Sequence, residues 1–94
     1  MNNISLLDKT PEEINRQIAE NIKRIRKRRK ISQKKLSEIS GVSLGSLKRF
    51  EQTGEISLIS LTKIAFALGL ESEMESLFSE VPFLSIEEIM NEQD

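Results

Sequence analysis

Residues 33–52 read QKKLSEISGVSLGSLKRFEQ, and their spacing predicts two short helices joined by a tight turn at Gly41. Glycine suits this turn because a residue that follows a helix often needs a positive φ, which glycine adopts without a Cβ penalty. Leu47 and Phe50 are three residues apart, so they share one helix face and are expected to enter the core. The two basic residues between them fall largely outside it.

Cap signals mark the start of nearly every other predicted helix. Thr10 is followed by a proline and then by Glu13, which is the spacing of a capping box. Serines at positions 32, 43 and 57 are predicted N-caps. The predicted helices span residues 11–30, 33–40, 44–53 and 58–68, with another opening at a capping box of Ser72 and Glu75 and a short one opening at Ser85.

Apolar spacing predicts which faces of these helices are buried. The first helix carries one stripe, and the fourth and fifth carry one inward face each. The residues expected inside are Ile14, Ile18, Ile22 and Ile25, then Leu58, Leu61, Ile64, Ala65 and Leu68, and finally Met74, Leu77 and Phe78. We therefore predict an all-α fold: a five-helix domain at residues 10–78, an N-terminal arm at 1–9 and an acidic C-terminal tail at 79–94.

Charge is segregated along the 94 residues, although the net charge is only −1. Residues 16–49 hold twelve Lys or Arg against Glu20 and Glu38, a net charge of +10. Residues 50–94 hold only Lys63 against ten acids, a net charge of −9. The pattern favours one half that faces a polyanion and another that avoids it. The alternative is an ordinary solvated basic helix face.

Catalysis and metal binding have few candidate residues in this sequence. There is no cysteine and no histidine, so the commonest general base, thiolate ligands and imidazole ligands are all missing. The four glycines lack the spacing of a phosphate-binding loop. We expect no enzyme, no cofactor and no metal site. No apolar run is long enough to span a membrane and no signal peptide begins the chain, so we expect a cytoplasmic protein.

Residues 12–78 resemble the phage-repressor/Cro type of helix-turn-helix, also called the XRE family. The resemblance implies a lambda-repressor-like fold and a double-stranded DNA operator as partner. A narrower similarity, to small HipB-like antitoxins, lies in residues 43–51 and 53–58. The residues that carry the family resemblance are Ile22, Arg26, Ile31, Ser32, Gln33, Leu36, Ser37, Gly41, Val42, Ser43, Leu47, Glu51, Leu58, Leu61, Ile64, Ala65, Ala67, Leu68, Gly69 and Leu70.

The resemblance also implies which residues meet DNA. Gln33 would hold the DNA backbone and brace the second helix of the motif, unless it is a plain exposed polar residue. Base reading falls on Ser43, Leu44, Gly45 and Arg49, with Ser46 and Lys48 nearby, and Arg49 is expected to make a bidentate guanine contact or to clamp a phosphate. Further phosphate contacts are expected from Arg28, Lys34, Lys35 and Lys48. Leu44 and Gly45 depart from the commoner pattern of polar residues there. Leu44 can touch a thymine methyl group or simply edge the core, and Gly45 can admit a close backbone approach.

An ion pair is expected between Arg26 and Glu51. Arg26 follows Ile22 by four residues, beside the apolar stripe, and so needs a partner. Glu51 is the only acid in the predicted helix 44–53. The family resemblance implies the same pair, and the alternative is two separate exposed charges.

The tail is predicted to be an interaction element. Val81, Phe83 and Leu84 are apolar around a proline that favours an extended chain, and Ile86, Ile89 and Met90 would share one face of a short helix. A helix of that length needs something to pack on: its own domain, a second protomer or a toxin-like partner.

These features predict a sequence-specific DNA-binding repressor that acts as a homodimer. The HipB-like similarity implies an antitoxin that also binds a HipA-like kinase toxin. The alternatives are a restriction–modification controller protein, which shares the fold, and a protein-interaction module whose basic half contacts an acidic partner.

Overall fold

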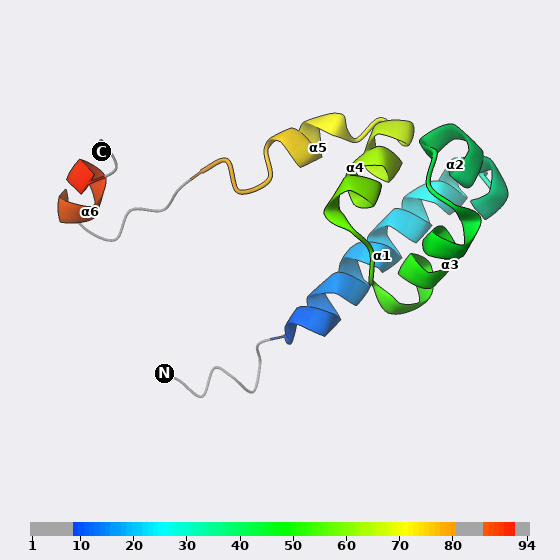
Figure 1. Ribbon diagram of the computed structural model, residues 1–94, viewed down its shortest axis with the longest axis horizontal. Helices are drawn as coiled ribbons and strands as arrows, with labels where there is room; N and C mark the ends of the chain where they lie inside the picture. The colour runs from blue at the N-terminus through cyan, green and yellow to red at the C-terminus, as the bar shows by residue number, and fades with distance from the viewer. Residues whose placement is uncertain (1–8, 81–85, 92–94) are drawn as a thin grey trace.

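The computed structural model describes residues 9–80 and 86–91, and within them the chain is helical with no strand. Figure 1 shows α1 running beside α3, with α2, α4 and α5 completing the domain. The predicted all-α, lambda-repressor-like fold is confirmed. The helices are α1 (Pro11–Arg28), α2 (Gln33–Ser40), α3 (Leu44–Thr53), α4 (Leu58–Ala67), α5 (Glu71–Glu75) and, in the tail, α6 (Ile86–Asn91).

Side-chain caps begin the first four helices, as predicted. The Thr10 hydroxyl accepts the Glu13 amide at 3.1 Å, and the Glu13 carboxylate accepts the Thr10 amide at 2.8 Å, which completes the capping box. The hydroxyls of Ser32, Ser43 and Ser57 each accept the amide three residues later. Each cap satisfies an amide that has no partner inside the helix, and so fixes where the helix starts.

The first helix is shorter than predicted because a left-handed residue ends it. α1 stops at Arg28, two residues before the expected end, and Lys30 has a φ of 56°. The Lys30 amide donates to the Lys27 carbonyl at 2.9 Å, and the Ile31 amide donates to the Arg26 carbonyl at 3.1 Å. This pair of bonds is a Schellman closure, which reverses the chain into α2.

The fifth helix corrects the predicted capping box. α5 begins at Glu71 and has no side-chain cap, so Ser72 already lies inside its first turn. The reason is the way α4 ends: the Leu70 amide donates to the Ala65 carbonyl at 2.8 Å, and the chain turns directly into α5. Because α5 stops at Glu75, the helical spacing used for Leu77 and Phe78 does not apply. Both are exposed, at 49% and 88%, and their predicted burial is wrong.

The core lies where α1, α2, α3 and α4 meet. Its largest fully buried side chains come from three of these helices and from the residue that ends α4: Leu36, Leu47, Phe50, Ile64 and Leu68. Ala19 and Ile22 complete it from α1. The predicted entry of Leu47 and Phe50 into the core is therefore confirmed.

Two predicted core faces are only partly buried. On α1, Ile22 is buried and Ile25 is half-buried, but Ile14 and Ile18 remain 46% and 39% exposed. Figure 1 shows the first turns of α1 reaching beyond the other helices, so the described residues cover Ile14 only in part, and Ile18 lines a surface pocket with Leu58 and Leu61. Leu58, at the first position of α4, is 67% exposed. The predicted burial of these three residues is wrong.

A buried ion pair joins α1 to α3. Arg26 donates to both carboxylate oxygens of Glu51, from Nε to Oε2 at 2.7 Å and from Nη2 to Oε1 at 2.9 Å. Arg26 Nη1 also donates to the Ile31 carbonyl at 2.8 Å, just beyond the end of α1. Gln33 Nε2 at the start of α2 donates to Glu51 Oε1 at 2.9 Å. The structure thus brings Arg26 and Glu51 together and adds Gln33 to the pair.

The pKa of Glu51 reflects two opposing causes. Burial raises it, but the hydrogen bonds from Arg26 and Gln33 and the charge of Arg26 lower it by more, so the pKa lies below its ordinary value of 4.5. A carboxyl whose pKa is lowered by folding stabilises the fold above its unfolded pKa. That stabilisation is lost as the pH falls through the folded pKa.

Replacing Glu51 by Ala should lower the free energy of unfolding by roughly 3–5 kcal/mol, because it leaves a buried guanidinium without its counter-charge. Urea unfolding at neutral pH measures this. The variant should also lose part of the wild-type dependence of stability on acidic pH. The matched control is Glu55→Ala, which removes the carboxylate of an exposed pair with Arg49 and should cost less than about 1 kcal/mol. Equal losses in the two variants would contradict the structural role of the buried pair.

Gly54 is expected to tolerate no side chain. Its φ is +83°, and a Cβ there would lie 2.7 Å from the backbone carbon of Asn15 on α1. Gly54→Ala should therefore lower the melting temperature by more than backbone strain alone would lower it, because the added Cβ also clashes with α1. Gly41→Ala is the control for strain, because Gly41 has a φ of +77° and nothing within 4 Å of a Cβ. A loss at position 54 no larger than that at position 41 would show that α1 can move away.

Candidate nucleic-acid interface

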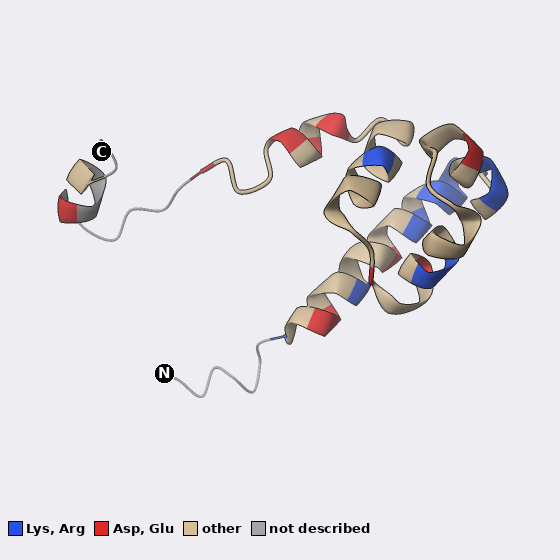
Figure 2. Cartoon of the chain, viewed as in Figure 1, with Lys and Arg blue, Asp and Glu red and all other residues tan. Residues whose placement is uncertain are grey.

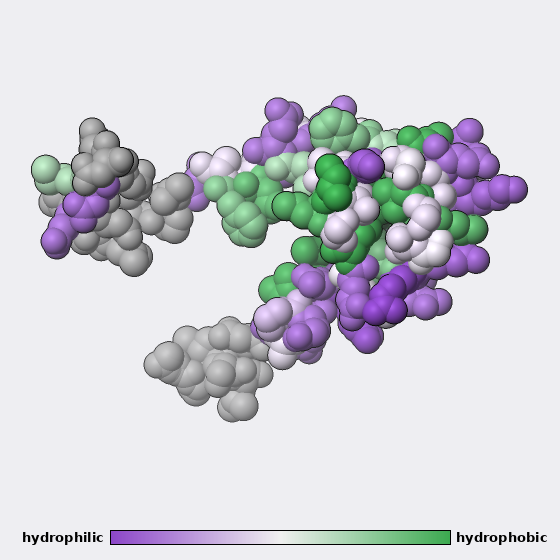
Figure 3. Space-filling view, in the orientation of Figure 1, coloured by the Kyte–Doolittle hydropathy of each residue, from purple (hydrophilic) through white to green (hydrophobic). Residues whose placement is uncertain are grey.

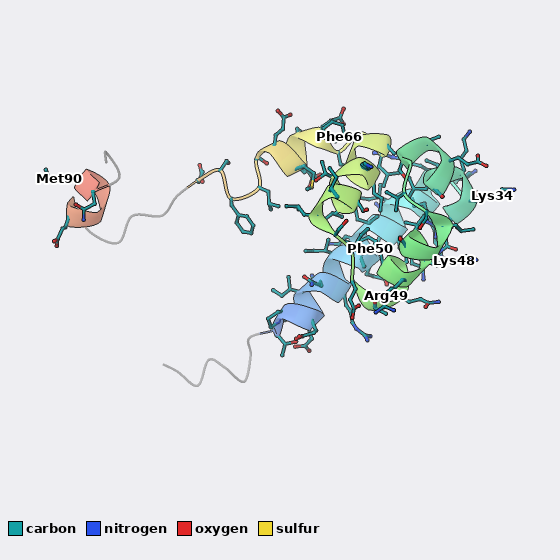
Figure 4. All side chains as sticks on the ribbon, viewed as in Figure 1. Lys34, Lys48, Arg49, Phe50, Phe66 and Met90 are labelled. Carbon is teal, nitrogen blue, oxygen red and sulfur yellow. The ribbon has the colours of Figure 1, made fainter. Side chains whose placement is uncertain are left out.

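The face of α3 that points away from the core is exposed to solvent from the first turn of the helix onward. Ser43, Gly45, Ser46, Lys48 and Arg49 are all exposed. Leu47 and Phe50 on the opposite face are buried, so the helix is fixed by its inner side while its outer side is free. Figure 4 shows Lys48 and Arg49 on the outside of the domain.

The hydroxyls of Ser43 and Ser46 are hydrogen-bonded to each other at the start of α3. Ser43 Oγ accepts the Ser46 amide at 3.1 Å as the helix cap and donates to Ser46 Oγ at 2.9 Å. The bond between the two hydroxyls uses one of their protons and leaves the other available to a base edge or a phosphate.

Leu44 and Gly45 occupy different environments. Leu44 is half-buried, so part of its side chain serves the packing and part remains on the surface. A Cβ built on Gly45 would meet nothing within 4 Å. The missing side chain leaves a flat spot on α3 where another molecule can approach the backbone closely.

Gln33 faces inward as well as outward. It is half-buried and its amide nitrogen donates to Glu51 on α3 at 2.9 Å. The bond fixes the start of α2 against α3, which holds the two helices of the motif at one angle. The structure thus brings Gln33 into contact with Glu51 on α3, and the expected contact of Gln33 with the DNA backbone stays a prediction.

Basic side chains surround this face. Arg28, Lys34, Lys35 and Lys48 are all exposed. Figure 2 shows Lys and Arg gathered on the C-terminal half of α1, on α2 and on α3, while most acids of the described residues lie elsewhere, notably on α5. The segregation of charge in the sequence therefore becomes a basic side and an acidic side of one small domain. A basic side that includes an open α3 suits a polyanion.

Arg49 has a partner that its sequence position did not predict. Arg49 Nη2 donates to Glu55 Oε1 at 2.6 Å, and both side chains are about two-thirds exposed, at 66% and 65%. Glu55 is six residues further on, too far for neighbours on one helix. The signal was Gly54, which ends α3 and turns the chain back toward Arg49.

Two other kinds of site are not found in the described parts of the chain. Residues 9–80 and 86–91 contain no group of His, Cys, Asp or Glu that can hold a metal ion. Among the same residues, no helix combines the length and the apolar character needed to cross a membrane.

The predicted tail site lies mostly outside the described residues. Phe83 and Leu84 fall there, as do the side chains of Ile86 and Ile89. The backbone of α6 forms the short helix predicted after Ser85, and Met90 on it is 66% exposed. The role of this tail remains a prediction.

Comparison with known families agrees with this geometry. A helix-turn-helix family model matches residues 22–73, more than half of the 94-residue chain. The match begins within α1, covers α2, α3 and α4 entirely and ends within α5. A search of curated proteins and a search of solved structures gave no significant match. The chain therefore belongs to the phage-repressor/Cro-type (XRE) helix-turn-helix family of DNA-binding transcription regulators.

Proposed function

We propose that this protein is a sequence-specific transcriptional repressor that binds a double-stranded DNA operator as a homodimer. The observation that carries the proposal is the way α3 is presented. Its inner side is held by the buried residues Leu47, Phe50 and Glu51, and its exposed outer side lies among basic residues. An α-helix presented in this way fits the major groove of B-DNA. Two protomers would place their α3 helices in successive grooves, about 34 Å apart.

Base reading is assigned to the exposed side of α3. Arg49 has four guanidinium N–H groups beyond the one bound to Glu55, enough for a bidentate contact with guanine. Ser46 offers a hydroxyl donor, the exposed part of Leu44 suits a thymine methyl group, and Gly45 lets the DNA come close. Ser43 contributes mainly through the cap that starts the helix.

Phosphate binding is assigned to the surrounding cations. Arg28, Lys34 and Lys48 are exposed on three different helices, so they can grip the backbone at separate points. Lys34 lies in the first turn of α2, where helix amides also favour a phosphate. Such contacts supply affinity and register, but no sequence preference of their own.

The homodimer is supported by the surface of α4. Its sequence, LISLTKIAFA, is apolar on almost every side, yet Ile59 and Phe66 remain 62% and 55% exposed. With Ile39 of α2 they line a shallow groove that also contains Lys63. Figure 3 shows hydrophobic residues gathered on this part of the surface. A helix that is apolar all round is normally covered by protein.

Charge complementarity favours a second copy as the cover. Lys63 lies within the apolar groove, and each protomer carries exposed acids on α5: Glu71, Glu73 and Glu75. In a twofold dimer the same patch meets itself, so Lys63 of each copy can meet acids of the other. The groove is lined by residues of α2 and α4 and by none of α3, so its occupation by a second copy leaves α3 free for DNA.

The acidic tail is proposed to add to the same dimer. α6 has only six residues, from Ile86 to Asn91, too few for a stable helix without a packing partner. Truncation after Ser79 should make DNA binding weaker and more dependent on protein concentration while α1–α4 stay folded. If the solution mass and the operator affinity of the truncated protein were unchanged, the tail would not contribute to the dimer. It would then contact its own domain or another protein.

An antitoxin role rests on the HipB-like similarity of residues 43–51 and 53–58. In that role the repressor would also bind a HipA-like kinase toxin. Purification of the tagged protein from its native cells, followed by identification of what accompanies it, separates an antitoxin from a restriction–modification controller. Neither alternative changes the DNA-binding proposal.

DNA affinity should fall steeply with salt, because several cations release counterions from the DNA backbone. Lys34→Ala should weaken binding to operator and random duplexes about equally and lower the salt slope by about 1. Arg49→Ala should cost roughly 1–3 kcal/mol on the operator and relax its sequence preference. Fluorescence anisotropy on a duplex selected from a random pool and on a random duplex measures both. If the two variants behaved alike on both duplexes, Arg49 would not read a base.

Phe66→Glu should disrupt the dimer, since it places a charge in the apolar α4 groove. The solution mass measured by light scattering should fall toward that of one protomer, and operator affinity should weaken. Ile14→Glu is the control, because Ile14 is an isoleucine near the N-terminal end of α1 that is 46% exposed. Both sites are exposed, so both variants should keep the helical circular dichroism of the wild type. If only Ile14→Glu lost the dimer, the interface would lie on α1 and not on α4.

A further inference from the structure

Glu55 forms an ion pair whose geometry suits DNA recognition better than it suits stability. Arg49 Nη2 and Glu55 Oε1 are 2.6 Å apart, but about two-thirds of each side chain is exposed to solvent. Exposed pairs of this kind contribute little to the free energy of unfolding, since water screens them. The effect of the pair is therefore on where the Arg49 guanidinium lies and on what it can bind.

The backbone around this pair is held firmly. Thr53 Oγ1 donates to the Arg49 carbonyl at 2.7 Å and accepts the Glu55 amide at 3.1 Å. One side chain thus links the backbones of both partners. Between them, Gly54 packs directly against the backbone of α1 at Asn15. Glu55 is presented beside α3 by a fixed turn, and is not a residue of a free loop.

We infer that Glu55 is a specificity-determining positioning residue that holds Arg49 for a base edge and away from phosphates. The inference rests on the proposed function and on Arg49 as the base reader. Glu55 occupies one N–H of the guanidinium, so the donors that remain can meet O6 and N7 of guanine. It also restricts the rotamers of a long side chain before DNA arrives, which lowers the entropy cost of binding.

The charge of Glu55 acts in the same direction. A carboxylate beside the guanidinium offsets its attraction to any phosphate and repels phosphate oxygens directly. A guanine edge carries partial charges only, so it is disfavoured much less. Glu55 thereby weakens binding to DNA of arbitrary sequence while it keeps the contact with the correct base, which is discrimination through a repulsive element.

The test is Glu55→Gln, compared with wild type on a duplex selected by the wild type from a random pool and on a random duplex. Affinity for the random duplex should rise. The ratio of the two affinities should fall about tenfold, the scale of one bidentate base contact. Selection with the variant should show a weaker guanine preference at one position of each half-site.

Glu38→Gln is the matched control. Glu38 is an exposed acid on α2, within the same basic half of the chain, and no hydrogen bond joins it to Arg49. This variant removes the same charge, so both duplexes should bind more tightly by a similar factor and the guanine preference should stay. If Glu55→Gln behaved like Glu38→Gln, only its net charge would matter and the positioning role would be overturned.

A double variant separates the action of Glu55 through Arg49 from any action of its own. In an Arg49→Ala background, Glu55→Gln should leave the affinity ratio unchanged; a further fall would mean that Glu55 reads DNA directly and would overturn the inference. The inference would also be overturned if the wild type enriched a sequence and Arg49→Ala left that sequence preference unchanged. The repressor proposal would then still stand. A wild-type protein that enriches no sequence would remove the proposed function itself.

Discussion

The buried contact of Arg26 with Glu51 is the constraint on which the rest of the domain depends. Two charges taken out of water must satisfy each other, and here each nitrogen of the Arg26 guanidinium has an acceptor: the Glu51 carboxylate for Nε and Nη2, and the Ile31 carbonyl for Nη1. No buried side-chain polar atom is left without a partner among the described residues. Because Gln33 joins the same carboxylate, the angle between α1, α2 and α3 is set by directional bonds as well as by apolar contact.

That constraint divides α3 into two functions. Leu47, Phe50 and Glu51 hold the helix to the domain, and the residues between and before them remain outside. A recognition helix must be rigid, since each base contact depends on placement within fractions of an ångström. The ion pair supplies rigidity at the C-terminal half of α3, and the Ser43 cap supplies it at the first turn.

The opposite side of the domain has a different physical character. α4 contributes Ile64 and Ala65 to the core but leaves Ile59 and Phe66 in water, and acids cluster on α5. Exposure of these apolar side chains to water is unfavourable, and their burial would matter because a small domain has little other apolar area to bury. The basic side and the apolar side thus carry different proposals, DNA as the partner of the first and a second protomer as the partner of the other.

The sequence by itself determined the helices and, for α1 to α4, where each of them begins. Threonine and serine caps act within three residues of their own position, and glycine or proline acts on a single φ, so local sequence is sufficient for them. The pairing of Arg26 with Glu51 was also predicted, since a charge beside an apolar stripe requires a partner. Base-reading positions on α3 were suggested by family resemblance, and the structure leaves most of them exposed.

Only the tertiary structure decided which apolar faces find a neighbour. Ile14, Ile18 and Leu58 fit a helical stripe as well as Ile22 does, but burial depends on the length of the helices packed against them, which no local pattern contains. The start of α5 depended on how the chain turns at Gly69 and Leu70, after the end of α4. The contact between Arg49 and Glu55 required the left-handed turn at Gly54 and its fit against α1, a juxtaposition that arises only once the chain has folded.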